Sequence, residues 1–350
     1  MRDLKVGVVG CGIHAQTHFK EIAKESRVHL TAIADINPDR LDKSKTEHRP
    51  DMAFNDYREM LATVALDLVY IITTPGHLLS IVLDCLEEGL NVSVEKPPGM
   101  NLAETKLMAK AARKSSGKAM VSFNRRYKPE ILAVRQMAQK NGGPVHVSAT
   151  YNKPLTDLYM GTPSTVGIYP DPLTADSIHH VDLLRWLASS TAHGAALPVA
   201  VYSEVQDGKQ PGAHRHNASI RFDNDCIGTL MSHFGVGMRI QRAEIHADDL
   251  SAYLDLTDKQ PKTEVYTASS PRAEQYEGNW RPSWGKGVML EKPLNLDSIG
   301  GPDFNETRHF VDCILNNENP WSDLDDSVHT MHLCKAIRDG HKGKLPFPVS

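Results

Sequence analysis

The stretch from Leu4 to Ala15, LKVGVVGCGIHA, decides the fold. Residues 6–9 form a short apolar run without polar alternation, which is typical of a strand buried on both faces in a parallel sheet. The pattern Gly10-x-Gly12-x-x-Ala15 follows at once. The first glycine permits a tight turn, the second lets the backbone approach a pyrophosphate, and the last small residue lets a helix pack closely on the strand. The stretch therefore predicts a strand, a turn and a helix whose N-terminal amides face the phosphates of a dinucleotide.

An acidic residue at the expected distance supports this prediction. Residues 29–34 are predicted as the second strand, and Asp35 follows directly. A carboxylate about 20 residues beyond the glycines can bind a ribose 2′-hydroxyl, and it would repel a 2′-phosphate. We therefore expect NAD as the cofactor. NADP stays open as an alternative, because Arg40 is near enough in the sequence to weaken that repulsion.

The composition is that of an ordinary globular protein. The 350 residues are 40% hydrophobic and 23% charged, and they are enough for two domains with their own cores. A net charge of −4 argues against nucleic acid as the main partner, and no apolar run is long enough to span a bilayer. The chain starts MRDLK and runs directly into the first strand, so we expect no secretory signal. Five widely spaced cysteines without a Cys-x-x-Cys pair predict a reduced, cytoplasmic protein without structural zinc.

Two kinds of pattern divide the chain. Strand and helix signals alternate up to residue 122, which predicts an N-terminal doubly wound parallel sheet of the Rossmann type. From residue 123 to 350 we expect a C-terminal α+β domain with a large, mostly antiparallel sheet, whose last helices can pack back on the first domain. Its predicted helices lie at 177–187, 304–316 and 325–340, after a linking helix at 127–140. Its predicted strands lie at 145–151, 199–206, 216–223, 226–234, 241–247 and 251–256.

Two clusters of turn-forming residues follow predicted strands, at the edge where open α/β sheets bind ligands. The first is 73–76, TTPG, and the second is 95–99, EKPPG. Lys96 is held between a strand and two prolines, where its ammonium group can hydrogen-bond a substrate hydroxyl or a developing alkoxide. The alternative is a solvated loop lysine. The candidate cofactor contacts are Gly10, Gly12, Ile13, His14, Asp35, Thr73, Thr74, Pro75, Glu95 and Lys96.

A second candidate group lies in the segment 173–187. Asp176 and His179 are three residues apart at the start of a predicted helix, so they can share one face. The positive end of the helix dipole lowers the pKa of a histidine there, which suits a neutral general base. We expect Asp176 to orient His179 or to cap the helix, and His180 to pack or to contact substrate. No metal-ligand spacing is found in 176–182, so no metal is expected.

Three further residues are candidate substrate contacts. Arg125 and Arg126 lie at the domain junction, and we select Arg126, although structural ion pairs are the alternative for either arginine. Tyr151 ends a predicted strand. Trp280 lies in the segment 257–303, which is rich in Pro, Gly, Ser and Trp; its indole can stack on a sugar ring or close the loop against the domain.

Taken together, these segments resemble the glucose–fructose oxidoreductase / inositol dehydrogenase / MocA (Gfo/Idh/MocA) family over nearly the whole chain. The matching features are Gly10-Cys11-Gly12 with His18, Asp35 with Asn37-Pro38, Thr74-Pro75, Gly89, Glu95-Lys96-Pro97, Asn124-Arg125-Arg126-Tyr127 with Pro129, the His179 helix ending Asp182-Leu183-Leu184-Arg185-Trp186, and Phe310 with Leu345-Pro346. The resemblance implies a Rossmann domain and a second domain whose open-faced sheet forms homodimers or homotetramers. It also implies NAD(P)-dependent oxidation of a sugar, polyol or sugar derivative, with Lys96 and His179 in the active site.

The chain departs from the family pattern before His179. The family commonly has Asp four residues and Gly two residues before this histidine, where this chain has Ala175 and Ser177. Asp176, at three residues, is expected to replace the family acid, because three and four are both same-face spacings on an α-helix.

The expected reaction is hydride transfer between a hydroxyl-bearing carbon and the nicotinamide ring. His179 would remove the hydroxyl proton, and Lys96 would stabilise the oxygen. Two alternatives remain. A glycosidase that retains its NAD would cut a glycosidic bond without accumulating NADH. A regulatory protein would bind NAD(P) without turnover, a possibility that Ala175 keeps open.

Overall fold

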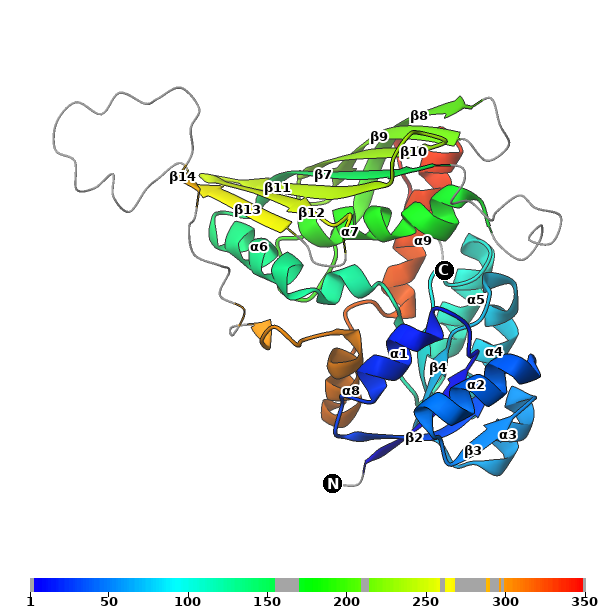
Figure 1. Cartoon of the computed structure of the whole chain (residues 1–350). Coiled ribbons are helices and arrows are strands. Elements are labelled where there is room, and N and C mark those ends of the chain that lie inside the picture. Colours follow the sequence, from blue (N-terminus) through cyan, green and yellow to red (C-terminus); the bar gives the residue numbers. More distant parts are fainter. Residues whose placement is uncertain are drawn as a thin grey trace, which may run out of the picture.

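The computed structural model describes residues 3–154, 170–208, 214–258, 262–267, 288–289, 296 and 299–348. Its helices and strands are arranged around two sheets, one in the lower and one in the upper half of Figure 1. Within these ranges, no helix combines the length and the apolar character that a membrane crossing needs.

The first sheet has six strands in the order β3-β2-β1-β4-β5-β6, and all its pairs are parallel. This is the doubly wound order that the alternation of strand and helix predicted. Its strands are β1 (Leu4–Val9), β2 (Val28–Ala34), β3 (Met52–Phe54), β4 (Leu68–Ile71), β5 (Asn91–Val94) and β6 (Ala119–Val121). Its helices are α1 (Ala15–Ile22), α2 (Pro38–His48), α3 (Tyr57–Thr63), α4 (Pro75–Glu87) and α5 (Leu102–Ala112).

Local chemistry explains where these helices begin. Asn37 caps α2 by accepting a hydrogen bond from the amide of Arg40, and Asn101 caps α5 in the same way. The helix α4 begins at Pro75, because a proline suits the first helical position. The short elements β3 and α3 were not predicted, since they are too short to show a clear hydrophobic period.

The second sheet has nine strands in the order β14-β13-β12-β11-β7-β10-β9-β8-β15. Only the pair β7 and β10 is parallel, so the expectation of a mostly antiparallel sheet is confirmed. The strands are β7 (Pro144–Lys153), β8 (Pro198–Asp207), β9 (His214–Phe222), β10 (Ile227–Phe234), β11 (Ile240–Ala247), β12 (Leu250–Asp255), β13 (Lys262–Thr267), β14 (Val288–Met289) and β15 (Lys342–Lys344). The last three of these were not predicted.

Helices cover one face of this large sheet and leave the other open (Figure 1). The covering helices include α6 (Pro129–Lys140), α7 (Ile178–Ala188) and α9 (Leu324–Arg338). Along β10 and β11 the side chains alternate between buried and more exposed, as expected for a sheet with one packed face. A π-helical turn, η3 (Leu173–Ser177), runs directly into α7, and a 3-10 turn, η1 (Asn124–Tyr127), precedes α6.

The end of the chain returns to the first sheet. The amide of Val121 in β6 donates to the carbonyl oxygen of Ser322 at 2.8 Å, just before α9. The helix α8 (Glu306–Asn316) lies beside α1 (Figure 1). The carboxyl ends of β1, β4 and β5 therefore face the helices that lie under the large sheet.

Candidate active site

The turn after β1 has the shape that a dinucleotide requires. Gly10 has φ +95°, and a Cβ atom there would lie 2.2 Å from the carbonyl oxygen of Ile72. At Gly12 an added Cβ would meet nothing within 4 Å, so the space above this residue is open. The helix α1 then begins without a side-chain cap. The amides of Gln16 and Thr17 donate to the carbonyl oxygens of Ile13 and His14 at 3.3 and 3.2 Å, so the glycine turn that precedes them is the part that fits a pyrophosphate.

Asp35 follows β2, where the sequence placed it. Its carboxylate accepts hydrogen bonds from the amides of Cys11 (2.7 Å) and Asn37 (2.8 Å), and it forms a bidentate pair with Arg40 at 3.1 and 2.8 Å. Burial alone would raise the pKa of Asp35, but Arg40 and the two amides outweigh burial and lower it. Asp35 is thus an ionised group at the position where the adenosine ribose of a bound cofactor would lie.

Apolar side chains flank the same turn. Ile13 is 89% exposed, and Ile36, directly after Asp35, is 81% exposed. Exposed aliphatic side chains at a ligand-binding edge gain stability when a planar base or ribose covers them.

The clusters at the ends of β4 and β5 lie side by side, because these strands are neighbours. Thr74 precedes α4, and Pro75 is its first residue. Glu95 uses its carboxylate inside the protein: Oε2 accepts from the backbone amide of Lys96 at 2.8 Å, and Oε1 lies 3.1 Å from His18 Nε2. Glu95 was expected to contact the cofactor, and in the structure its carboxylate fixes the backbone of Lys96.

Glu95 belongs to a buried group of charged side chains that also contains His18 and Glu306. The ring of His18 lies between Glu95 and Glu306, and Glu306 accepts hydrogen bonds from Ser122 at 3.0 and 2.9 Å. Burial lowers the pKa of His18, but the hydrogen bond to Glu95 and the charge of Glu306 raise it more, from 6.5 to about 9. His18, Glu21 and Glu306 also bring three possible metal-ligating atoms within 4.8 Å of one another, among the residues that the structure describes.

Lys96 reaches from the first sheet to the helices under the second. The bond between Lys96 and Pro97 is cis. The Nζ atom donates to the carbonyl oxygen of Ala175 at 3.1 Å, in the π-helical turn that leads into α7. Lys96 is therefore held at its backbone by Glu95 and at its ammonium group by the turn that precedes His179.

His179 lies in the first turn of α7, and it is neutral. Its Nδ1 is buried and has no hydrogen-bond partner in the described part of the chain. Burial lowers the pKa of His179 well below 6.5, and the positive charges of Arg125 and Lys96 lower it further. A neutral imidazole beside a lysine and an arginine can accept a proton from a substrate hydroxyl.

Asp176 forms an ion pair with Lys153 instead of a hydrogen bond to His179. Its Oδ2 accepts from Lys153 Nζ at 2.7 Å, and the lysine side chain is only 5% exposed. The expectation that Asp176 and His179 share a face assumed α-helical geometry. Residues 173–177 form a π-helical turn, which changes the angle between side chains three residues apart. Ser177, at the family's glycine position, is buried and shares a hydrogen bond of 2.7 Å with Ser232.

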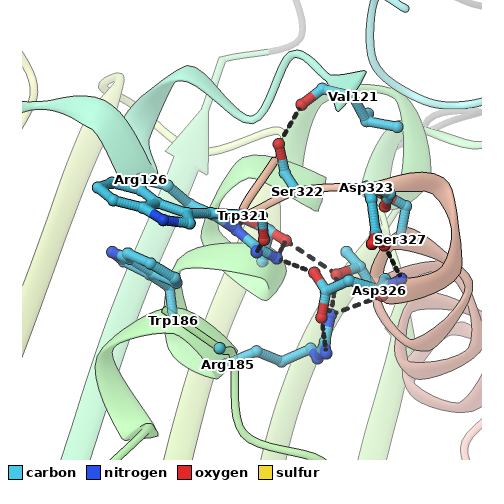
Figure 2. A network of polar contacts seen from close by, with 12 residues as sticks. Val121, Arg126, Arg185, Trp186, Trp321, Ser322, Asp323, Asp326 and Ser327 are labelled. Atoms are coloured by element: carbon cyan, nitrogen blue, oxygen red, sulfur yellow. Dashed lines mark hydrogen bonds and ion pairs between the residues drawn. The ribbon is translucent and has the colours of Figure 1, made fainter. Parts of the chain in front are cut away.

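Arg126 has a structural place, which corrects its assignment as a substrate contact. Its guanidinium is fully buried, and it binds the carboxylate of Asp182. It also binds the carboxylate of Asp326 and the carbonyl oxygen of Trp321 (Figure 2). Arg185 binds the other oxygen of Asp326. Because two carboxylates and a carbonyl group already surround it, Arg126 cannot face a substrate.

Arg125 is the arginine that reaches the site. Its Nη1 donates to His180 Nδ1 at 2.5 Å, and its Nη2 donates to the side-chain oxygen of Gln241. His180 is fully buried, and the ring of Tyr151 packs edge-on against it at 5.1 Å. The predicted substrate contacts Tyr151 and His180 thus lie against each other, beside Arg125. Trp280 lies outside the described residues.

Sequence reasoning missed Lys153 and Gln241. Tyr151 and Lys153 are two residues apart in β7, so their side chains lie on the same face of the strand. This spacing could have identified Lys153 from the sequence. Gln241 lies on β11, and its approach to Arg125 depends on how strands distant in the sequence pair. No local pattern indicates such a contact.

Comparison with known proteins supports an NAD-binding fold. Residues 4–123 match a family described as "Oxidoreductase family, NAD-binding Rossmann fold". The chain is 24% identical to the uncharacterized oxidoreductase YrbE of Bacillus subtilis, over 99% of this chain and 97% of that protein. It is 22% identical to myo-inositol 2-dehydrogenase of Thermotoga maritima, over 73% of this chain and 79% of that protein. It shares its fold with levoglucosan dehydrogenase in complex with NADH, with a TM-score of 0.78 and 19% identity over 99% of this chain and 100% of that one.

Proposed function

Because this chain belongs to the Gfo/Idh/MocA family of NAD-binding oxidoreductases, we propose that it transfers a hydride between NAD(H) and a sugar, polyol or sugar derivative. The observation that carries the proposal is the bond between Lys96 Nζ and the carbonyl oxygen of Ala175, four residues before His179. This bond brings a cation and a neutral imidazole together at the carboxyl ends of β4 and β5. The relatives with a named activity are dehydrogenases, which favours net oxidation over NAD-retaining hydrolysis or a regulatory role.

The residues of the first sheet fit the cofactor. The glycine turn at the positive end of α1 would hold the pyrophosphate, and Asp35 would face the adenosine ribose. Bound NAD⁺ supplies a hydride acceptor, a chemistry that no side chain of the protein offers. The protein contributes orientation, proton transfer and charge stabilisation.

His179 is proposed as the general base. Its depressed pKa keeps it neutral and ready to accept the proton of a substrate hydroxyl. Lys96 is proposed to hydrogen-bond the same oxygen as negative charge develops on it. One of its donors is bound to Ala175, so its remaining donors can point at substrate. Asp176 is proposed to have an indirect role: its ion pair with Lys153 neutralises the charge of this lysine beside the site.

The test is NADH formation with a panel of sugars and polyols. We expect wild-type protein to reduce NAD⁺ with at least one of them, and we expect Lys96→Met and His179→Asn to lower kcat by about 10²–10⁴-fold. Lys110→Met and His29→Asn, both at exposed positions of the first domain, serve as matched controls with unchanged kcat. Intact hydride transfer in Lys96→Met or His179→Asn would contradict the assignment of these two residues.

We also propose that the open face of the nine-stranded sheet pairs with a second copy of the chain to form a homodimer or homotetramer. This face exposes apolar side chains on several strands, including Ile227 (37%), Met231 (42%) and Tyr253 (40%). Light scattering on a size-exclusion column tests this, and Met231→Lys should shift the protein toward monomer. All five cysteines are buried and unpaired, which supports a cytoplasmic location.

A further inference from the structure

Two consecutive arginines in η1 have opposite electrostatic surroundings. Arg126 is enclosed by the carboxylates of Asp182 and Asp326, which balance its charge. Arg125 donates to two neutral groups, the imidazole of His180 and the amide oxygen of Gln241. In the described part of the chain, no carboxylate forms an ion pair with Arg125.

The groups that face Arg125 are mainly positive or neutral. Asp176 is the acidic group close enough to interact with it, but Asp176 is already paired with Lys153 at 2.7 Å. Arg239, in the connection between β10 and β11, adds a second positive charge near His180. Lys96 adds a third near His179. Arg125 is partly buried, and its pKa is lowered to about 10, chiefly by this burial, as expected for a partly buried cation without a paired carboxylate.

We propose that the substrate carries an anionic group, a carboxylate or a phosphate, and that Arg125 binds this group. The proposal rests on the proposed function, since it names the class of sugar derivative that the same site accepts. A partly buried charge without a partner is less stable than a paired one, and a bound anion would supply the missing charge. A guanidinium presents parallel N–H donors that match a carboxylate or phosphate in a bidentate arrangement. A neutral hydroxyl could accept one of these hydrogen bonds but would leave the charge of Arg125 uncompensated.

The position of Arg125 orients the substrate. Lys96 and His179 would meet the reacting hydroxyl, and Arg125 would hold the anionic group on the side of the site formed by His180 and Gln241. Such a two-point attachment selects which hydroxyl of a polyhydroxylated ring faces the cofactor. Specificity would then depend on where the acid stands on the ring.

The experiment compares substrates in matched pairs, with NAD⁺ present throughout. Glucose is paired with glucuronate and galactose with galacturonate, and glucose 6-phosphate separates a phosphate from a carboxylate. We expect at least one anionic member to have a kcat/KM about 10- to 100-fold above its neutral partner, the size expected for a charge-assisted hydrogen bond. This advantage should shrink at high salt, because counter-ions screen a partly exposed pair.

Three variants locate the effect. Arg125→Met should raise KM for the anionic substrate about 10- to 100-fold, with a smaller change in kcat, and Arg125→Lys should recover part of the loss. Arg113→Met, at the surface after α5 and away from both the site and the open sheet face, is the matched control and should behave as wild type. The Kd for NADH, measured by fluorescence, should be unchanged in all three variants, which shows that each still folds and binds cofactor.

Calorimetric binding of the same compounds to the NADH-loaded protein separates this proposal from the proposed function. Binding of an anionic sugar that Arg125→Met abolishes would support the anion site even if no compound is oxidised. Oxidation of neutral sugars at the same kcat/KM as their acids, with Arg125→Met unaffected, would overturn the anion site and leave the dehydrogenase assignment intact. Absence of both binding and turnover for every anionic compound would also overturn it.

Discussion

Replacing Arg126 with methionine should destabilise the whole protein. The guanidinium is fully buried, and it bridges Asp182, which is 1% exposed, and Asp326, which is 19% exposed. It also lies 5.3 Å from the centre of the Trp186 ring, and Figure 2 shows it beside Trp186 and Asp326. Removing it leaves Asp182 with Thr330 as its remaining hydrogen-bond partner. Loss of one partner from a buried ion pair costs about 3–5 kcal/mol, so we expect the free energy of unfolding of Arg126→Met to fall by that amount.

Urea denaturation followed by tryptophan fluorescence measures this loss, since Trp186 and Trp321 stack at 5.5 Å beside the network. Arg113→Met is the matched control. Arg113 pairs with Asp325 at the surface, with side chains 45% and 50% exposed, and an exposed pair contributes about 0–1 kcal/mol. The free energy of unfolding at acid pH gives a second measurement. Burial would raise the pKa of Asp326, but Arg126 and Arg185 lower it to about 2. The resulting stability is present above the ordinary value of 3.8 and is lost as the pH falls through about 2; it should shrink in Arg126→Met.

A loss of stability in Arg126→Met no larger than in Arg113→Met would contradict the structural role of Arg126. This role is also contradicted if Arg126→Met folds normally and shows only a raised KM, because that result would return Arg126 to the substrate site. The expected result, a large loss of stability with an unchanged KM in the folded fraction, would place Arg126 in the connection between η1, α7 and α9.

Three further predictions concern the first sheet. Gly10→Ala should lose both stability and NADH binding, because residue 10 has φ +95° and the new Cβ would overlap the backbone. Gly12→Ala should keep its stability and weaken only NADH binding, because no atom lies within 4 Å of the new Cβ. Thermal melts measure the stability, and fluorescence titration measures the binding of NADH. His18 has a pKa raised from 6.5 to about 9, so its contribution to stability is complete below 6.5 and is lost as the pH rises through about 9; unfolding between pH 6 and 10 should show this slope in wild type and a flatter one in His18→Gln. Arg40→Ala should raise the ratio of kcat/KM for NAD over NADP by about 10-fold or more, because Asp35 would then repel a 2′-phosphate without a neighbouring cation; an unchanged ratio would show that Arg40 plays no part in cofactor choice.

The features that the sequence predicted well depend on short stretches of chain. A run of buried residues, two glycines and an acid after the second strand have local causes: backbone conformation, strand burial and the end of a strand. The structure agrees at Gly10, Gly12 and Asp35 for these reasons. Caps such as Asn37 and Asn101 are local in the same way, since a cap and the amide it binds are three residues apart or less.

The contacts that were misassigned or missed join residues that are far apart in the sequence. Lys153 is the last residue of β7, and Asp176 lies in the π-helical turn that precedes α7. This turn removes the same-face spacing that an α-helix would give Asp176 and His179. Arg125 and Arg126 are adjacent and chemically identical, yet one faces the site and the other is enclosed by Asp182 and Asp326. Nothing in the local sequence distinguishes them.

The sequence by itself therefore determined the doubly wound sheet, the cofactor turn and the class of chemistry, because backbone conformation and hydrophobic period are written into consecutive residues. Only the tertiary structure decided which charges are balanced. The free energy of a buried charge depends on the groups that folding brings within a few ångströms, and these come from other elements of the chain. That is why Lys96 could be placed at the sheet edge from its motif, while the uncompensated charge of Arg125 became visible only when η1, α7 and β11 were seen together.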